Sequence, residues 1–372
     1  MARSSSLQRH LDRAVGVPAV RALRFARKRR PLPSDPQCIV VIQPTAIGDA
    51  ILSSGVVARL KGRYPQAALW VLQGASNAAA VAMIDAPIQT QTVPFNRPHK
   101  AVAALRALKP DLVVDLTPWP RATALAAQLS GAVCVGFDSE NQHRAAAFDC
   151  PVPHGCGRHE IENFAALADA VAGPAPYAMA LKRGWPEPAP ALPWDRLALV
   201  HVNPGGSQAA AKSWPAAHWA VVIRALAERG MQVGLTGVPA DAAVVDAALT
   251  AAALPDDQAY SLVGRWSLPA LAGALERARL VLSVDTGVMH LAAALQAPLV
   301  ALHGPTRPGR WGPVSDNAEA VLSPHPAAGY IQFGFEDHPD ASAVMPALAP
   351  EVVLAAVDRQ LARPYGAPNR PK

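Results

Sequence analysis

The sequence predicts an α/β protein with two Rossmann-like, doubly wound parallel sheets. Short apolar runs of strand length alternate with stretches whose apolar residues recur at helical spacing, and this alternation occurs twice, on either side of a proline-rich stretch. Continuous apolar runs are typical of parallel strands, because helices cover both faces of such a sheet. A chain of 372 residues also suits two domains of roughly 150 residues each better than one.

The first series begins with the apolar run 38–42, which lies between Pro36 and Pro44. Apolar residues then recur at helical spacing over 49–63, and Tyr64 and Pro65 close that helix. The other elements expected in this half are strands at 69–72 and 112–116 and a helix at 102–108.

A linker separates the two series, because prolines crowd one short segment and exclude regular structure. These prolines are Pro174, Pro176, Pro186, Pro188, Pro190 and Pro193. The second series then predicts strands at 197–202, 232–236, 280–284 and 299–302 and helices at 216–229, 241–253 and 285–295. The predicted domains are a basic tail at 1–36, two Rossmann-like domains at 37–172 and 197–349 joined by a linker at 173–196, and a C-terminal helix and tail at 350–372.

The net charge of +6 is concentrated at one end of the chain. Residues 1–36 hold nine basic side chains against Asp12 and Asp35, a balance of +7, whereas the remaining residues carry 25 basic and 26 acidic groups. The nine are Arg3, Arg9, Arg13, Arg21, Arg24, Arg27, Lys28, Arg29 and Arg30. A neutral body lacks the basic face that phosphate backbones require, so nucleic acid is not expected as a partner.

No secretory signal and no membrane span are visible, since the longest apolar stretch, 291–302, contains Gln296 and Pro298. The four cysteines form no CxxC pair, which argues against a zinc module or a disulfide framework. We therefore expect a cytoplasmic protein.

Three strand-to-helix turns are candidates for a ligand site, because ligands of open parallel sheets lie beyond the carboxyl ends of the strands. The common dinucleotide, P-loop, nucleophile-elbow and zinc-protease motifs are absent from the sequence. The first turn places Gly48 and Asp49 at the start of a helix. Asp49 there is either a catalytic carboxylate or a cap that accepts a backbone N–H and favours the helix dipole.

The second and third turns have features of anion sites. Gly205 and Gly206 let backbone N–H groups approach an anion, and Lys212 adds a charge; a flexible loop before a capped helix is the alternative. In the third turn, Thr286 and Gly287 begin a helix of small residues whose bare N–H groups suit a phosphate. His290, one turn further, would by itself be assigned to the core.

Together these turns resemble the signature of the ADP-heptose:lipopolysaccharide heptosyltransferases, glycosyltransferase family 9. The resemblance covers roughly 38–362, and its most specific part is the DTGxxH segment at 285–290. Its other segments are 47–49, 203–206, 212–215, 235–241, 291–294, 303–306 and 312–313. It implies a GT-B fold, with two Rossmann-like domains facing a central cleft, and a last helix at 350–363 that crosses back to the first domain.

The resemblance implies an inverting, metal-independent glycosyltransferase that moves heptose from ADP-heptose to a lipopolysaccharide-core or other glycan acceptor. Asp49 would be the general base that deprotonates the acceptor hydroxyl, and Lys212 would pair with the donor diphosphate. The other implied donor-binding residues are Gly205, Gly206, Asp241, Asp285, Thr286, Gly287 and His290. No metal and no cofactor are expected, because a lysine and a helix N-terminus can balance the developing charge.

The acceptor side is less defined. Arg97, Lys100, Arg121 and Arg144 fall where the family places cations for acidic sugars, with a solvated surface as the alternative. Two other functions stay open: a GT-B transferase for another sugar nucleotide, and a non-catalytic sugar-nucleotide-binding protein tethered by its tail.

The tail itself is expected to bind an anionic membrane surface, since anionic lipid attracts such segments by about 1 kcal/mol per basic residue. Residues 1–36 would then attach the protein peripherally to the inner face of the cytoplasmic membrane. A tail without a partner is the alternative, and binding of the tail to nucleic acid is a third.

Overall fold

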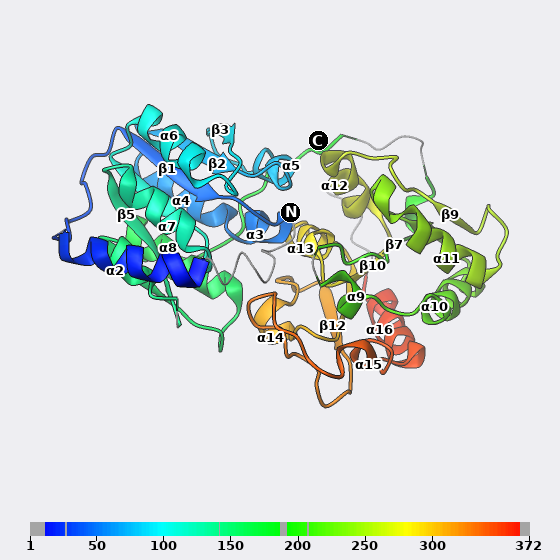
Figure 1. The fold of residues 1–372 in the computed structure, drawn as a ribbon. Coiled ribbons are helices and arrows are strands. Elements are labelled where there is room, and N and C mark those ends of the chain that lie inside the picture. Colours follow the sequence, from blue (N-terminus) through cyan, green and yellow to red (C-terminus); the bar gives the residue numbers. More distant parts are fainter. Residues whose placement is uncertain (1–11, 27, 141, 187–191, 207, 365–372) are drawn as a thin grey trace. The chain divides into compact units, whose positions relative to one another are not determined.

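The computed structural model describes residues 12–26, 28–140, 142–186, 192–206 and 208–364 (Figure 1). The chain divides into two compact units, Met1–Lys182 and Arg183–Lys372. Each unit contains one six-stranded sheet in which all strands are parallel, with helices packed on it. The predicted α/β class is therefore confirmed.

In the first unit the strands follow the order β3-β2-β1-β4-β5-β6, the doubly wound Rossmann order, with β1 at the switch point. They are β1 (Cys38–Gln43), β2 (Ala68–Gln73), β3 (Gln89–Thr92), β4 (Leu112–Asp115), β5 (Val133–Ser139) and β6 (Cys150–His154). The helices are α2 (Val17–Ala26), α3 (Ile47–Leu52), α4 (Ser54–Arg63), α5 (Ala78–Val81), α6 (Pro98–Leu108), α7 (Arg121–Leu129) and α8 (Glu160–Ala172). Two short helical turns, η1 (Asp12–Gly16) and η2 (Arg144–Ala147), complete the unit.

The second unit repeats this order as β12-β11-β10-β7-β8-β9, with β7 at the switch point. Its strands are β7 (Leu197–His201), β8 (Gln232–Leu235), β9 (Ala259–Ser261), β10 (Leu280–Val284), β11 (Leu299–His303) and β12 (Ala318–Leu322). Its helices are α9 (Ala209–Lys212), α10 (Ala216–Glu228), α11 (Ala242–Ala252), α12 (Leu268–Arg277), α13 (Gly287–Ala294), α14 (Pro308–Trp311), α15 (Ala341–Val344) and α16 (Pro350–Ala362). The turns η3 (Trp194–Arg196) and η4 (Pro239–Asp241) precede β7 and α11.

Every apolar run predicted as a strand forms one, and these strands lie in the middle of the sheets. The outer strands were not predicted: all four side chains of β3 are polar and exposed, and β6 contains Pro151 and Pro153. The inner strand β5 was missed as well, although most of its side chains are buried. The helix predicted at 49–63 is two helices, α3 and α4, which meet at Ser53.

The N-terminal segment differs from the separate tail predicted at 1–36. Residues 1–11 lie outside the described part, but α2 packs against α7 and η2, and Val20 is fully buried in the core of the first unit. Arg30 donates to the carbonyl oxygens of Gly131 (3.0 Å) and Ala132 and forms an ion pair with Asp149. Apolar burial and this arginine therefore fix part of the segment to the fold.

The predicted linker is also partly fixed. The Tyr177 hydroxyl donates to the Leu52 carbonyl oxygen at 2.7 Å, and the backbone N–H of Ala180 donates to Ser54 Oγ at 2.9 Å. Leu181 forms an antiparallel bridge with Ile84. Residues 177–182 thus belong to the first unit, and the boundary between the units lies after Lys182.

The C-terminal helix α16 packs against α10, β11 and β12 of the second unit, and Val353, Ala356 and Val357 join the core of that unit. The crossing of this helix to the first domain, which the family resemblance implies, stays a prediction. None of the described helices combines the length and apolar character that a membrane span requires.

Candidate active site

The carboxyl edge of the second sheet brings together three residues predicted to bind a donor. Lys212, at the end of α9, forms an ion pair with Asp285, which directly follows β10; the distance from Nζ to Oδ2 is 2.7 Å. His290 Nε2 lies 4.0 Å from the other carboxylate oxygen. The Asp285 side chain is 8% exposed and that of Lys212 is 21% exposed, so the lysine retains solvent contact that a ligand can replace.

The charge state of Asp285 follows from its neighbours. Burial alone would raise the pKa of this carboxyl group, but Lys212, His303 and His290 outweigh that effect and hold the pKa well below its usual range. These neighbours therefore favour the carboxylate form of Asp285, which accepts a hydrogen bond from the Lys212 ammonium group.

The N-terminus of α13 lies next to this pair. Thr286 is the N-cap, and its Oγ1 accepts hydrogen bonds from the backbone N–H groups of Val288 (3.1 Å) and Met289 (3.4 Å). The helix dipole places partial positive charge at this end. A lysine and a helix N-terminus at one strand end form an arrangement that suits a diphosphate.

The glycine turn after β7 has the backbone freedom that the sequence predicts. Gly205 has φ +59° and Gly206 has φ +76°, values that L side chains rarely adopt. The N–H of Gly205 donates to Asn203 Oδ1 at 3.2 Å. Gln208 Nε2 donates to the carbonyl oxygen of Glu336 at 3.2 Å, which connects this turn to the loop after β12.

That second loop was not predicted as part of the site. The Glu336 carboxylate accepts the backbone N–H groups of Phe333 (2.8 Å), Gly334 (3.0 Å) and Phe335 (3.1 Å). One acidic side chain thus shapes the loop that touches the glycine turn. The sequence signal for this loop is the glutamate Glu336 directly after one glycine and two phenylalanines at 333–335.

Asp241 links two turns at the same edge. Its Oδ2 accepts the N–H of Val238 at 2.8 Å, and its Oδ1 accepts from Asn203 Nδ2. A Cβ at Gly237 would lie 2.9 Å from both Cβ and Oδ2 of Asp241, so glycine makes room for the carboxylate. The buried Asp241 therefore fixes the shape of the edge, and its predicted contact with a ribose stays a prediction.

In the first unit, Asp49 lies in the first turn of α3 and is partly exposed. The N-cap position of that helix is Ala46 rather than Asp49, but a carboxylate in the first turn still favours the helix dipole, so both interpretations of Asp49 stay open. Ala46 has φ +60°, a conformation that is strained for a residue with a Cβ. Such strain concentrates at functional turns.

The turn after β2 packs against the start of the turn that carries Asp49. Asn77 is fully buried; its Oδ1 accepts the N–H of Gly74 at 3.0 Å and its Nδ2 donates to the Gln43 carbonyl oxygen at 3.0 Å. A Cβ at Gly74 would lie 2.0 Å from the Pro44 carbonyl oxygen. The turn that carries Asp49 therefore rests on a glycine that has no room for a side chain.

We expect Gly74→Ala to destabilise the protein by about 1–3 kcal/mol, because the backbone at Pro44 must move to accept the methyl group. Turnover should fall with it, since Pro44 begins the turn that leads to Asp49. Urea denaturation and an activity assay measure both effects. Gly62→Ala is the matched control: Gly62 lies in α4 with nothing within 4 Å of its would-be Cβ, so this change should not destabilise. Equal stability of the two variants would contradict the prediction.

The four predicted acceptor cations fall into two pairs. Arg97 and Lys100 are exposed at the start of α6. Arg121 is buried and donates to Gln142, from Nε to the carbonyl oxygen at 2.8 Å and from Nη2 to Oε1 at 3.0 Å. Arg144 is fully buried in an ion pair with Asp115. The prediction that Arg121 and Arg144 present loop cations to a ligand is therefore corrected: both groups hold protein groups together.

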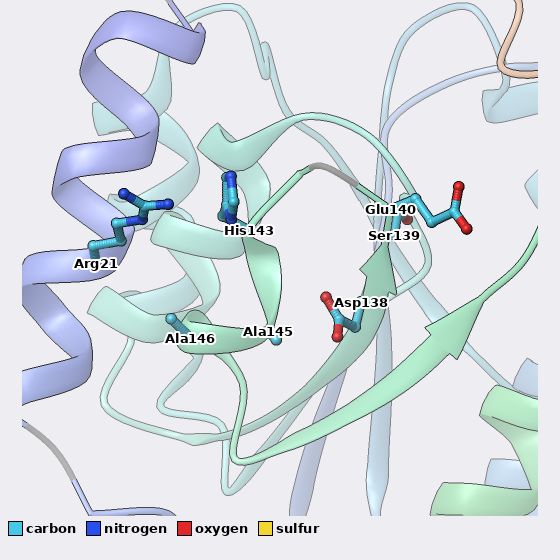
Figure 2. A pocket seen from close by; sticks show the side chains of 7 residues that line it. All are labelled: Arg21, Asp138, Ser139, Glu140, His143, Ala145 and Ala146. Atoms are coloured by element: carbon cyan, nitrogen blue, oxygen red, sulfur yellow. The ribbon is translucent and has the colours of Figure 1, made fainter.

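An arginine and a histidine that the prediction did not assign to a site lie at a surface hollow of about 470 Å³ at the carboxyl end of β5. Figure 2 shows Arg21 of α2 and His143 toward one side and Asp138 and Glu140 toward the other. Arg21 was assigned to the tail, and His143 follows a short turn with no motif. The packing of α2 onto the first unit brings them together.

Among the described residues, no group of three or more His, Cys, Asp or Glu side chains is placed to hold a metal ion.

Each of the two units is an α/β unit with a parallel sheet, and two such units are the architecture of GT-B glycosyltransferases. The second unit here also has a lysine next to a helix N-terminus. The solved structure of Escherichia coli ADP-heptose lipopolysaccharide heptosyltransferase II superposes with a TM-score of 0.66 at 23% identity, covering 87% of this chain and 98% of that one. E. coli heptosyltransferase WaaC with ADP gives 0.65 at 20% identity, covering 87% and 99%. These matches show the GT-B fold.

The chain belongs to glycosyltransferase family 9 (heptosyltransferase), which residues 99–331 match. The protein is thus a glycosyltransferase. Lipopolysaccharide heptosyltransferase 2 of Salmonella typhimurium is 27% identical over 318 residues, covering 76% of this chain and 87% of the relative. Lipopolysaccharide heptosyltransferase 1 of Pseudomonas aeruginosa is 29% identical over 235 residues, covering 60% and 62%.

Proposed function

We propose that this protein transfers heptose from ADP-heptose to a sugar of the lipopolysaccharide core, with inversion at the anomeric carbon and without a metal ion. Family membership supports the sugar, and the names of the relatives support the donor and the acceptor class. The observation that carries the donor side is the Lys212–Asp285 pair beside the N-terminus of α13. We assign the donor to the second unit and the acceptor to the first.

In the proposed reaction, Asp49 accepts the proton of the acceptor hydroxyl group while the oxygen of that hydroxyl group attacks the anomeric carbon of heptose. The bond from that carbon to the diphosphate oxygen breaks, and ADP leaves with the bonding electron pair. A single displacement of this kind inverts the anomeric centre.

The leaving diphosphate gains negative charge as the bond breaks. An ammonium group has three donors, so Lys212 can keep its bond to Asp285 and also contact a phosphate oxygen. The N–H groups at the start of α13 add a fixed dipole that needs no reorganisation during the reaction. These two groups supply the charge stabilisation that a metal ion supplies in other transferases.

Calorimetric titration of the purified protein with ADP, UDP, GDP and CDP tests the donor side. Tight binding of ADP and transfer of heptose from ADP-heptose, unchanged in EDTA and with an inverted product by NMR, is the expected result. Transfer from another sugar nucleotide would favour the first alternative function, and binding without transfer would favour the non-catalytic one. If no nucleotide bound, all three would be wrong.

We also propose that the basic N-terminal segment attaches the protein to anionic membranes. Arg21, Lys28 and Arg29 are exposed on the described part of this segment. Because Arg30 and Val20 hold the segment on the first unit, these charges would lie at a fixed surface of the acceptor unit. A lipid-linked acceptor would then be found on the same membrane.

Deleting the segment would also remove Val20 from the core, so charge substitutions are the cleaner test. We expect Lys28→Gln/Arg29→Gln to weaken co-sedimentation with anionic vesicles roughly 30-fold at low salt, since each of the two cations contributes about 1 kcal/mol. Added salt should reduce wild-type binding as well. The control Arg63→Gln/Arg196→Gln changes two exposed arginines outside the segment. An equal loss in the control would place the membrane contact elsewhere.

A further inference from the structure

The connection between β4 and α7, residues 116–120, lies beside the turn that carries Asp49. Strand β4 pairs with β1, with Asp115 opposite Ile42, and the N–H of Leu116 donates to the Ile42 carbonyl oxygen at 3.1 Å. Adjacent parallel strands are about 4.8 Å apart. The two connections therefore leave the sheet side by side, and a sugar positioned at Asp49 would be close to residues 116–120.

This connection is fixed at its start by a buried carboxylate. Asp115 Oδ1 accepts from both the N–H (3.0 Å) and the hydroxyl (2.6 Å) of Thr117. The Thr117 hydroxyl also lies 2.7 Å from that of Thr123 in α7. Thr117 is thus held from both ends of the connection.

Arg144 contacts both Asp115 and Thr117. Its Nη2 lies 2.6 Å from Asp115 Oδ2, both side chains are 0% exposed, and its Nη1 donates to the Thr117 carbonyl oxygen. Burying such a pair brings little net stability, because the desolvation of both ions offsets their attraction. What the pair determines instead is the path of the backbone at Thr117.

The rest of the connection is held by two further hydroxyl groups. Ser139, at the end of β5, donates to the Pro118 carbonyl oxygen at 2.6 Å, and Thr123 donates to that of Pro120 at 2.9 Å. With Thr117, the carbonyl groups on both sides of Trp119 are hydrogen-bonded by buried side chains. The prolines at 118 and 120 restrict the backbone further.

Trp119 is therefore a partly exposed residue whose neighbouring carbonyl groups are both hydrogen-bonded, in the connection next to the Asp49 turn. An indole face is electron-rich and apolar, and it binds the C–H face of a pyranose ring while the ring hydroxyls stay in water.

We infer that Trp119 stacks against the acceptor sugar and orients its reactive hydroxyl toward Asp49. Thr117 and Arg144 act as positioning residues that hold the indole in place. This inference rests on the proposed function, because it takes the first unit to be the acceptor side.

Trp119→Ala tests the inference. We expect the acceptor KM to rise roughly 10-fold, the value for one lost aromatic contact, with a smaller effect on kcat and no change in ADP affinity. Trp119→Phe, which keeps an aromatic face, should restore most of the loss. Trp194→Ala is the matched control, since Trp194 is also partly exposed but lies in η3 before β7. An unchanged acceptor KM in Trp119→Ala would overturn the inference.

Direct binding separates this test from the proposed function. Saturation-transfer NMR with deacylated inner-core oligosaccharide, without donor, measures acceptor binding even if no transfer occurs. If the wild type binds the oligosaccharide and Trp119→Ala does not, the stacking role is supported even if heptose transfer fails. If Trp119→Ala binds the oligosaccharide as well as the wild type does, the stacking role is wrong.

Thr117→Val tests the support. Valine keeps the shape but removes the hydroxyl that donates to Asp115 and lies 2.7 Å from the Thr123 hydroxyl. We expect the acceptor KM to rise several-fold while the ADP affinity on the second unit stays constant. A variant that lost stability in urea but kept the wild-type acceptor KM would show that Thr117 serves the fold alone.

Discussion

Asp49→Ala is expected to reduce turnover roughly 100-fold or more, the range for a lost general base. Donor affinity should stay close to that of the wild type, because the donor-binding candidates belong to the second unit. Initial rates at saturating donor and acceptor, together with calorimetry of ADP, measure the two quantities separately.

Asp49→Asn is the shape-matched control for this experiment. Asparagine has nearly the same volume and can still accept a hydrogen bond, but it cannot take up the proton at neutral pH. It should lose as much activity as alanine does. If Asp49 only complemented the dipole of α3, either change would cost about 0.3–1 kcal/mol of stability and leave turnover within a few-fold.

Lys212→Met should weaken ADP binding roughly 10- to 100-fold, the range for one charge-assisted contact to a phosphate. The loss should be larger at low salt, where the attraction is screened least. Lys212→Arg keeps the charge and should retain part of the affinity. Equal ADP affinity in Lys212→Met and the wild type would remove Lys212 from the donor site.

Removing Lys212 also leaves Asp285 buried without its closest counter-charge, which destabilises the fold by itself. The double variant Lys212→Met/Asp285→Asn separates the two effects. It removes the buried anion as well, so stability should recover in urea denaturation while ADP binding stays weak. Recovery of binding together with stability would mean that Lys212 acts only through the fold.

Residues close in sequence to an apolar strand were predictable as site candidates. Asp49 follows β1, Gly205 follows β7, and Asp285 follows β10, each in a motif that identifies the strand end. A strand buried on both faces must be apolar throughout, so its end is visible in the sequence. That is why the three strands that precede these turns were found, although the inner strand β5 was missed.

Contacts across long sequence separations were not predictable. All four predicted acceptor cations have the same charge. Arg121 and Arg144 are nevertheless buried, where they contact Gln142 and Asp115, whereas Arg97 and Lys100 are exposed. Nothing local to Arg144 indicates that its partner is 29 residues away. The arginines could therefore be assigned only after the chain was folded.

Local periodicity and short motifs at strand ends were enough to predict the class, the family and the candidate chemistry of this protein. Which charged groups are available became visible only in the folded chain, which pairs Lys212 with Asp285, buries Arg144 against Asp115, and packs α2 of the basic segment onto the first unit. Desolvation depends on everything that packs around a charge, including segments more than a hundred residues distant in the sequence. Arg30 and Asp149, 119 residues apart, are one such pair.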